Sequence, residues 1–215
     1  MGVIAEKIVY FRNRLPEGVR LAAVSKFKPA EAIMEAYEAG QRLFAENRPL
    51  EFEDKARKLP ADIEWHFIGH LQTNKVKNVV PYAALIQSID SEHLLKAVND
   101  YAARIGKVQD ILLEVFVASE TTKQGLSEEE AVDLAKRIGE YPNVRLRGVM
   151  AMATFTDDMD QVRREFSKAA AIAAKVAAAG IEKPEISMGM TSDYEVAIEC
   201  GSTIVRIGTA IFGAR

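Results

Sequence analysis

The sequence predicts a single (β/α)8 barrel of the TIM type with an extra helix at its amino terminus. At 215 residues the chain is long enough for one well-buried domain and short for two. Strand-like runs alternate with helical runs throughout, and eight strand-then-helix units in a chain of this length favour a closed barrel. A doubly wound open sheet is the alternative, since alternation alone does not decide closure. No glycine-rich dinucleotide fingerprint follows the first strand, which weakens that alternative.

The elements are predicted in order along the chain. A helix over Val3–Arg14 precedes the first strand. The predicted strands are Leu21–Val24, Leu43–Ala45, Trp65–Ile68, Leu85–Ser88, Ile111–Val117, Arg145–Met150, Glu185–Ser187 and Thr203–Arg206. The predicted helices between them are Pro29–Ala39, Arg48–Lys58, Thr73–Val80, Ser91–Ala103, Ser127–Ile138, Asp158–Ala179 and Ser192–Glu199. No linker, repeat or low-complexity tract interrupts them, so we expect one domain over residues 1–215.

Several helix ends carry sequence signals. Residues 127–130 read Ser-Glu-Glu-Glu, the pattern of a capping box, and Ser91 and Thr73 are expected as N-caps. Gly40 and Gly180 stand where glycines end helices. These signals support the boundaries of the alternating helices.

Composition and charge exclude several classes of function. Hydrophobic residues make up 48% and charged residues 27%, as in ordinary globular proteins, and the net charge of −3 gives no case for nucleic acid or an anionic membrane. No stretch approaches the roughly 20 apolar residues of a membrane span. Cys200 is the single cysteine, which excludes an internal disulfide and fits a reducing compartment. With no signal-peptide pattern at the start, we expect a cytoplasmic protein.

In a barrel of this type, functional residues lie at the carboxyl-terminal ends of the strands. That rule selects Lys26, Asn47, His70, Lys123, Met150, Ser187 and Arg206 with Gly208 and Thr209. The loops after the last two strands commonly hold phosphate groups, and glycine lets the backbone approach a phosphate closely. An amine, a guanidinium and a small phosphate cradle at one mouth would suit a phosphorylated aldehyde held as a Schiff base.

Lys26 and Arg206 each have an ordinary interpretation beside the functional one. A lysine before a proline-started helix can simply be solvated, and an arginine can be a structural ion-pair partner. If Lys26 points into the mouth, burial and the nearby Arg206 would favour its neutral amine, the form that attacks an aldehyde. If the bound aldehyde carries a pyridine ring and Arg206 faces the ring nitrogen, this permanent cation would disfavour protonation of that nitrogen. The ring would then stabilise a carbanion poorly, which favours a protein that holds a cofactor over one that performs carbanion chemistry.

Five blocks of sequence together carry a family resemblance. They are Ala23–Lys26, Ala45–Arg48, His66–Lys75, Ser187–Asp193 and Gly201–Gly213. These blocks resemble the pyridoxal-phosphate homeostasis protein family. They occur in order from about residue 20 to the end of the chain, and the third and last are long and specific.

The resemblance implies a monomeric barrel similar to the N-terminal domain of alanine racemase. Pyridoxal 5'-phosphate would be bound as an aldimine to Lys26. Arg206 would face the ring nitrogen and Asn47 would line the ring. The phosphate would be held by Ser187, Gly208 and Thr209. Met150 and Met152 share one face of a strand end, where core packing explains them and a cofactor contact of Met150 is the further prediction.

The family resemblance implies a role in intracellular vitamin B6 and amino-acid homeostasis, without committed catalytic turnover. We expect a protein that stores, delivers or buffers the cofactor, with pyridoxal-phosphate-dependent apoenzymes as candidate partners. The alternative is a pyridoxal-phosphate-dependent amino-acid racemase. That enzyme needs a second base, for which Tyr194 is a candidate, and a following β-domain, which is not expected because the chain ends at Arg215. A Schiff-base aldolase acting through Lys26 on a sugar phosphate is a third possibility, which the resemblance disfavours.

Four further positions complete the prediction. His66 and His70 are four residues apart but not on one helical face, so we predict no zinc site, and His70 is expected to order its loop. Lys123, in a Lys-x-Gly turn, is either a second amine near the mouth or an exposed loop lysine. Phe116 is expected in the fifth strand, where the family often has asparagine.

Overall fold

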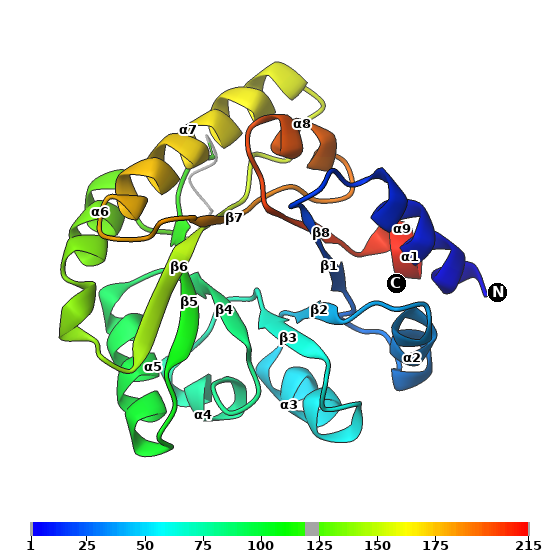
Figure 1. Cartoon of the computed structure of the whole chain (residues 1–215), viewed down its shortest axis with the longest axis horizontal. Coiled ribbons are helices and arrows are strands. Elements are labelled where there is room, and N and C mark those ends of the chain that lie inside the picture. The colour runs from blue at the N-terminus through cyan, green and yellow to red at the C-terminus, as the bar shows by residue number, and fades with distance from the viewer. Residues whose placement is uncertain (1, 119–124, 215) are drawn as a thin grey trace.

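The computed structural model describes residues 2–118 and 125–214, which form one closed parallel barrel wrapped by helices (Figure 1). Each strand pairs with the next along the chain, and β8 pairs with β1 to close the ring. The strands are β1 (Arg20–Val24), β2 (Leu43–Glu46), β3 (Glu64–Phe67), β4 (Leu85–Ile89), β5 (Gln109–Val115), β6 (Val144–Ala151), β7 (Glu185–Ser187) and β8 (Ile204–Ile207). The predicted fold class is confirmed, and the open-sheet alternative is wrong.

The helices lie outside the barrel, and α1 packs beside α2 and α9 near both ends of the chain (Figure 1). The α-helices are α1 (Val3–Arg14), α2 (Ala30–Glu38), α3 (Pro49–Lys58), α4 (Val76–Val79), α5 (Glu92–Arg104), α6 (Glu128–Lys136), α7 (Met159–Ala177), α8 (Tyr194–Glu199) and α9 (Thr209–Phe212). Two 3-10 turns, η1 (Thr73–Lys75) and η2 (Ile138–Glu140), complete the set. Within the part of the chain that the structure describes, no helix has the length and apolar character needed to cross a bilayer.

The sequence signals at helix ends are largely confirmed. The Ser91 hydroxyl accepts the Leu94 N–H, and Ser127 and Glu130 form the reciprocal bonds of the capping box. Gly40 and Gly180 both have positive φ values, 92° and 108°, just after their helices.

Two predicted details are wrong, and one element was missed. Thr73 is not an N-cap but the first residue of η1, and its preceding residue provides no side-chain cap. Phe116 lies outside β5, because the strand ends at Val115 and the Phe116 N–H turns to the Leu126 carbonyl at 2.9 Å. The short helix α9 was not predicted, since its four residues are too few to show a helical period.

Side chains inside the barrel come from every second residue of the strands, as pleated strands require. An apolar group made of Ala22, Val24, Leu43, Ala45, Leu85, Leu112, Met150 and Ile204 packs together as a cluster of its own. A larger cluster fills the space between the strands and the surrounding helices. This apolar interior cluster fills the barrel below its carboxyl-terminal mouth, so the functional side chains lie above a close-packed layer.

Candidate functional site

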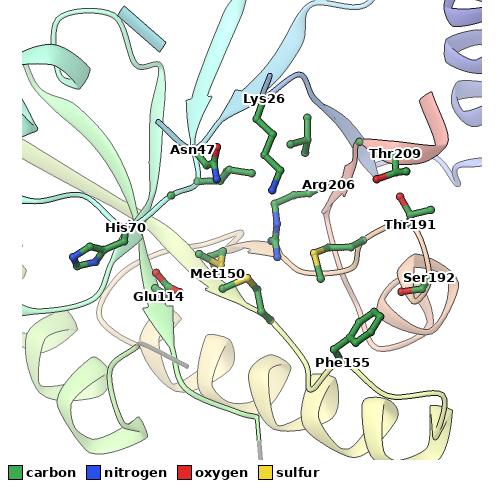
Figure 2. Close-up of a pocket in the computed structure, with 16 residues that line it drawn as sticks. Lys26, Asn47, His70, Glu114, Met150, Phe155, Thr191, Ser192, Arg206 and Thr209 are labelled. Atoms are coloured by element: carbon green, nitrogen blue, oxygen red, sulfur yellow. The ribbon is translucent and has the colours of Figure 1, made fainter. Parts of the chain in front are cut away.

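A cavity of about 570 Å³ opens at the carboxyl-terminal end of the barrel (Figure 2). Its volume is within the range usual for small-molecule sites. It is lined by Val24, Lys26, Asn47, Ile68, Gly69, His70, Glu114, Met150, Met152, Phe155, Met190, Thr191, Ser192, Arg206, Gly208 and Thr209. Six of the seven predicted cofactor-binding residues are in this set, namely Lys26, Asn47, Met150, Arg206, Gly208 and Thr209. These six residues, which the sequence placed at the carboxyl-terminal ends of the strands, therefore lie around one cavity.

The alternation of strand side chains explains the position of Glu114. It lies within β5, two residues after the interior Leu112, and therefore points to the same interior side, nearer the mouth. Lys26 and Asn47 lie just beyond the ends of β1 and β2, and both line the cavity. Figure 2 shows the Lys26 side chain extending into the cavity toward the Arg206 guanidinium.

Ser187 is the exception, and its predicted role in direct phosphate binding is not supported by its position. On β7 it is paired in register with Met150, which lines the cavity, and with Ile204, which does not, and Ser187 itself is not among the lining residues. It is fully buried, and its hydroxyl donates to Gln87 Oε1 at 2.6 Å. Gly189, two residues after the end of β7, lies beside Arg206, because its carbonyl accepts the Arg206 N–H at 2.9 Å.

Arg206 enters the cavity wall from β8 and is itself buried. Its Nη1 donates to the Ser187 carbonyl at 2.8 Å and to the Ser187 hydroxyl at 2.7 Å, and its Nη2 donates to the Ala151 carbonyl at 3.0 Å. Burial lowers the pKa of Arg206 to about 10, so the guanidinium remains a cation at neutral pH. The site therefore presents a fixed positive charge to any ligand.

Glu114 is a cavity residue that sequence reasoning missed. It is nearly buried in the wall, and burial first, then the charge of Asp90, raise its pKa to about 7, against a smaller opposing effect of Arg206. The signal for it was present, since it is a single carboxylate at an inward position of an otherwise apolar strand segment, residues 111–115. A carboxyl that is half protonated near neutral pH can accept or donate a hydrogen bond to a bound molecule.

A group of small polar residues lies on one side of the cavity. Thr191, Ser192 and Thr209 are exposed, and Figure 2 shows them to one side of Arg206, opposite Asn47 and Glu114. Thr191 and Ser192, in the loop before α8, were also missed as site residues. A Cβ placed on Gly208 would lie 3.2 Å from the Val24 carbonyl oxygen, so glycine allows the backbone to sit closely against β1.

The remaining predicted residues fall outside the cavity or at its edge. His70 Nδ1 lies 2.9 Å from Asp90 Oδ2, a contact between the β3 and β4 loops that agrees with a loop-ordering role. Tyr194, the candidate second base, does not line the cavity. Its hydroxyl donates to Glu195 and its ring packs on Phe11. Lys123 lies outside the described residues.

Known proteins share both the sequence and the fold of this barrel. The alanine racemase N-terminal domain family matches residues 2–215. The pyridoxal phosphate homeostasis protein of Vibrio alginolyticus is 42% identical over 208 residues, which cover 94% of this chain and 89% of the relative. The protein of the same name from Escherichia coli K12 is 40% identical over 210 residues, covering 94% of this chain and 88% of the relative.

Solved structures agree with these relatives. PipY of Synechococcus elongatus PCC7942, solved with PLP bound, matches with a TM-score of 0.90 at 34% identity, over 98% of this chain and 100% of PipY. Alanine racemase of Clostridium difficile 630 matches with a TM-score of 0.80 at 14% identity, over 99% of this chain and 57% of the racemase, a likeness of fold alone. The chain belongs to the pyridoxal phosphate homeostasis protein family, whose barrel is that of the alanine racemase N-terminal domain.

Proposed function

We propose that this protein binds pyridoxal 5'-phosphate covalently through Lys26 and serves its homeostasis without a committed catalytic turnover of its own. The observation that carries the proposal is the Lys26 side chain, which enters one cavity together with the Arg206 cation and a group of hydroxyls (Figure 2). The names of the relatives and the PLP-bound state of PipY support the same ligand. When bound, the cofactor supplies an aldehyde, whose carbon forms a C=N bond with the lysine nitrogen while its oxygen leaves as water.

The residues present fit the two ends of this molecule. Thr209, Thr191 and Ser192 offer hydroxyl donors beside Gly208, a set suited to a phosphate dianion. Ser187 is assigned no direct phosphate contact. On the other side of the cavity, Asn47 Oδ1 is buried and accepts no hydrogen bond from any described residue. An unmet buried acceptor facing a cavity is expected to pair with a donor of the ligand.

Arg206 supports binding over catalysis. A permanent guanidinium beside the pyridine ring discourages protonation of the ring nitrogen, and an unprotonated ring withdraws electrons poorly from a bound amino acid. We infer that the protein holds the cofactor and releases it to pyridoxal-phosphate-dependent apoenzymes, a transfer that an open cavity allows. Phe155, at the rim, is 86% exposed, which leaves the mouth accessible from solvent.

A racemase is the second candidate, because Glu114 places an ionisable carboxyl in the cavity. Such an enzyme would exchange the Cα hydrogen of alanine for deuterium in heavy water. We expect no exchange above that of free pyridoxal phosphate. Exchange that is fast in the wild type and lost in Glu114→Gln would establish the enzyme instead.

The attachment is tested by visible absorption and borohydride reduction, followed by peptide mapping. The wild type mixed with pyridoxal phosphate should turn yellow, bleach on reduction and carry the label on Lys26. Lys26→Ala should lose the label. Lys28→Ala is the matched control, because Lys28 lies in the same turn but its Nζ bonds to the Ala214 carbonyl instead. A label that persists in Lys26→Ala, or a colourless wild type, would overturn the proposal.

A further inference from the structure

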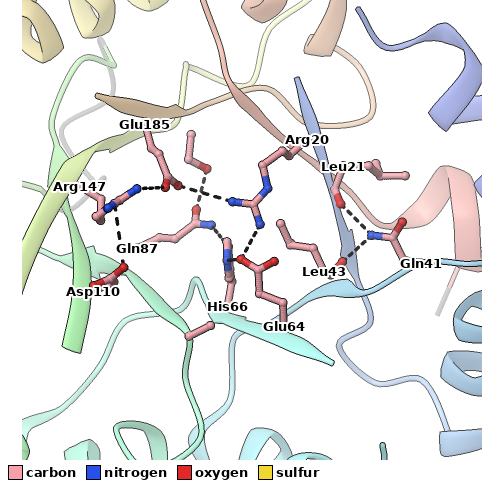
Figure 3. Close-up of polar contacts among 12 residues, drawn as sticks. Arg20, Leu21, Gln41, Leu43, Glu64, His66, Gln87, Asp110, Arg147 and Glu185 are labelled. Carbon is pink, nitrogen blue, oxygen red and sulfur yellow. Dashed lines mark hydrogen bonds and ion pairs between the residues drawn. The ribbon is translucent and has the colours of Figure 1, made fainter. Parts of the chain in front are cut away.

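A line of hydrogen-bonded side chains crosses the barrel interior from Glu64 to Arg206, which lines the cavity. Figure 3 shows its part from Gln87 through His66 to Glu64. Arg206 Nη1 lies 2.7 Å from Ser187 Oγ, which lies 2.6 Å from Gln87 Oε1. The amide nitrogen of Gln87 lies 2.8 Å from His66 Nδ1, and His66 Nε2 lies 3.1 Å from Glu64 Oε1. Four strands contribute to this line, β8, β7, β4 and β3, and its three middle residues are fully buried.

The direction of every hydrogen bond in the line is fixed by its two ends, Glu64 and Arg206. An ionised carboxylate only accepts, so His66 Nε2 donates to Glu64. A guanidinium only donates, so the Ser187 oxygen accepts from Arg206, and its own proton goes to Gln87 Oε1. The Gln87 amide then presents its N–H groups to His66 Nδ1, which must accept. His66 is therefore neutral with its proton on Nε2, where it donates to Glu64.

The charges at the far end agree with this assignment. Burial lowers the pKa of His66, which keeps the imidazole neutral. Hydrogen bonds from His66 and then Arg20 lower the pKa of Glu64 to about 2, so an ionised acceptor is always present. Arg20 also lies 3.9 Å from Glu185, whose carboxylate lies 3.4 Å from Arg147 (Figure 3). The line is thus anchored in an ion-pair network at the opposite end of the barrel.

We propose that His66 and Gln87 are positioning residues that orient the Arg206 guanidinium against the ligand in the cavity, acting through the Ser187 hydroxyl. Without the Gln87 acceptor, the Ser187 hydroxyl is free to rotate. Its proton can then point toward the guanidinium or compete with it for the nearby carbonyl acceptors. The cation would then sit less closely against a bound ring. The ligand in this inference rests on the proposed function. The hydrogen-bonded line rests only on the contacts among the described residues.

Gln87→Met tests the proposal, because methionine keeps the length of the side chain and removes both polar atoms. Gln41→Met is the matched control. Gln41 is also buried, and its amide donates to the Leu21 and Leu43 carbonyls at 2.7 and 2.6 Å, apart from the line (Figure 3). Both variants should lower the melting temperature by similar amounts, so a merely structural effect appears in both.

The informative readout is the pH titration of the yellow adduct at Lys26. A looser guanidinium repels a proton near the ring less strongly, so Gln87→Met should raise the apparent pKa of the adduct by about one unit. Gln41→Met should leave it unchanged. If Gln87→Met fails to fold, Glu64→Gln at the half-exposed end of the line should give a smaller shift in the same direction. Equal titrations in the wild type and the line variants, or an equal shift in Gln41→Met, would overturn the proposal.

A second measurement needs no ligand and separates this inference from the proposed function. In the free wild-type protein, side-chain ¹⁵N NMR should show His66 as the neutral tautomer protonated on Nε2, and Gln87→Met should alter the Nδ1 signal. An imidazolium at neutral pH, or a proton on Nδ1, would contradict the line even if the adduct forms. A wild type without adduct but with this tautomer would overturn the proposed function and leave the line established without a ligand to orient toward.

Discussion

Lys55 Nζ donates a hydrogen bond to the Ser25 carbonyl at 2.8 Å, which ties helix α3 to the residue just before Lys26. The same ammonium lies 2.7 Å from Glu51 Oε1, and that oxygen accepts the Phe27 N–H at 2.6 Å. The backbone on both sides of Lys26 is therefore held by one cluster on α3. Since the lysine has a long and flexible side chain, this fixed backbone decides where its amine can reach.

Lys55→Met should destabilise the protein and slow formation of the Lys26 adduct. Glu46 is fully buried, and its Oε1 lies 2.8 Å from Lys55 Nζ and 2.6 Å from the Ser25 hydroxyl. Removing the ammonium leaves a buried carboxylate without its counter-charge, a change that typically costs about 3 to 5 kcal/mol. Urea unfolding measures this loss, and stopped-flow absorbance measures the adduct rate.

Lys58→Met is the control for this prediction. Lys58 lies on the same helix but is exposed, and its partner Asp54 is exposed as well. We expect little change in unfolding free energy or in adduct rate, because surface ion pairs contribute little. Similar losses in the two variants would mean that the Lys55 cluster does not specifically hold the Lys26 turn.

Phe27→Gly should be more stable than Phe27→Ala. Phe27 has a φ of 63°, and it is the one non-glycine residue with positive φ among those described. Both variants lose the ring that stacks under the Arg48 guanidinium, so that loss cancels in the comparison. Alanine keeps the left-handed strain and glycine does not, which predicts a difference of about 1 kcal/mol in unfolding free energy.

Two measured stabilities decide this prediction. If alanine equals or exceeds glycine, the turn before α2 relaxes out of the left-handed conformation and the lysine-bearing backbone is less rigid than the structure indicates.

Glu114→Gln should stabilise the cofactor-free protein at high pH and not at low pH. The folded state raises the Glu114 pKa from 4.5 to about 7, so the folded protein holds its proton where the unfolded chain has lost it. This contribution is complete below about pH 4.5 and is lost as the pH rises through about 7, a difference of about 3 kcal/mol. Unfolding free energies of both proteins across this range measure it.

The comparison of the two proteins cancels the other titrating groups. The advantage of Glu114→Gln over the wild type should grow between about pH 4.5 and about pH 7 and then level off. A constant difference at every pH would mean that the Glu114 carboxyl titrates normally and is solvated in the folded protein.

The barrel could be predicted from the sequence because its signal is repeated. Eight strand-like runs recur between helices, and the fold class depends on this repetition. An error at the boundary of one element therefore does not change the prediction of the other elements. The ends of single elements were less certain. Phe116 continues the apolar run of β5 in sequence, but its N–H bonds to Leu126, a contact with a segment that local sequence does not specify.

The sequence predicted which strand ends contribute residues to the site, but not the contacts that each side chain makes there. Lys26, Asn47 and Arg206 were found because a polar residue at the end of an apolar strand is visible in the sequence. Ser187 was assigned to the phosphate because it also ends a strand, but its level in the barrel depends on the register between β7 and β8. Register is set by three-dimensional pairing, so sequence position alone could not show that the Ser187 hydroxyl bonds to Gln87 and Arg206 and does not line the cavity.

Thr209→Val combined with Ser192→Ala should weaken binding of pyridoxal phosphate about 10- to 100-fold and leave pyridoxal nearly unchanged. Both residues line the cavity at exposed positions, and each hydroxyl offers one donor to the phosphate. A hydrogen bond there contributes about 0.5 to 1.5 kcal/mol, so losing two of them gives the predicted change in affinity. Absorbance titrations with the two ligands give the ratio of affinities. Ser187→Ala is the control, because its buried hydroxyl bonds to Gln87 and Arg206 and should leave that ratio intact. If Ser187→Ala changes the ratio and the double variant does not, the phosphate lies deeper in the barrel than this cavity places it.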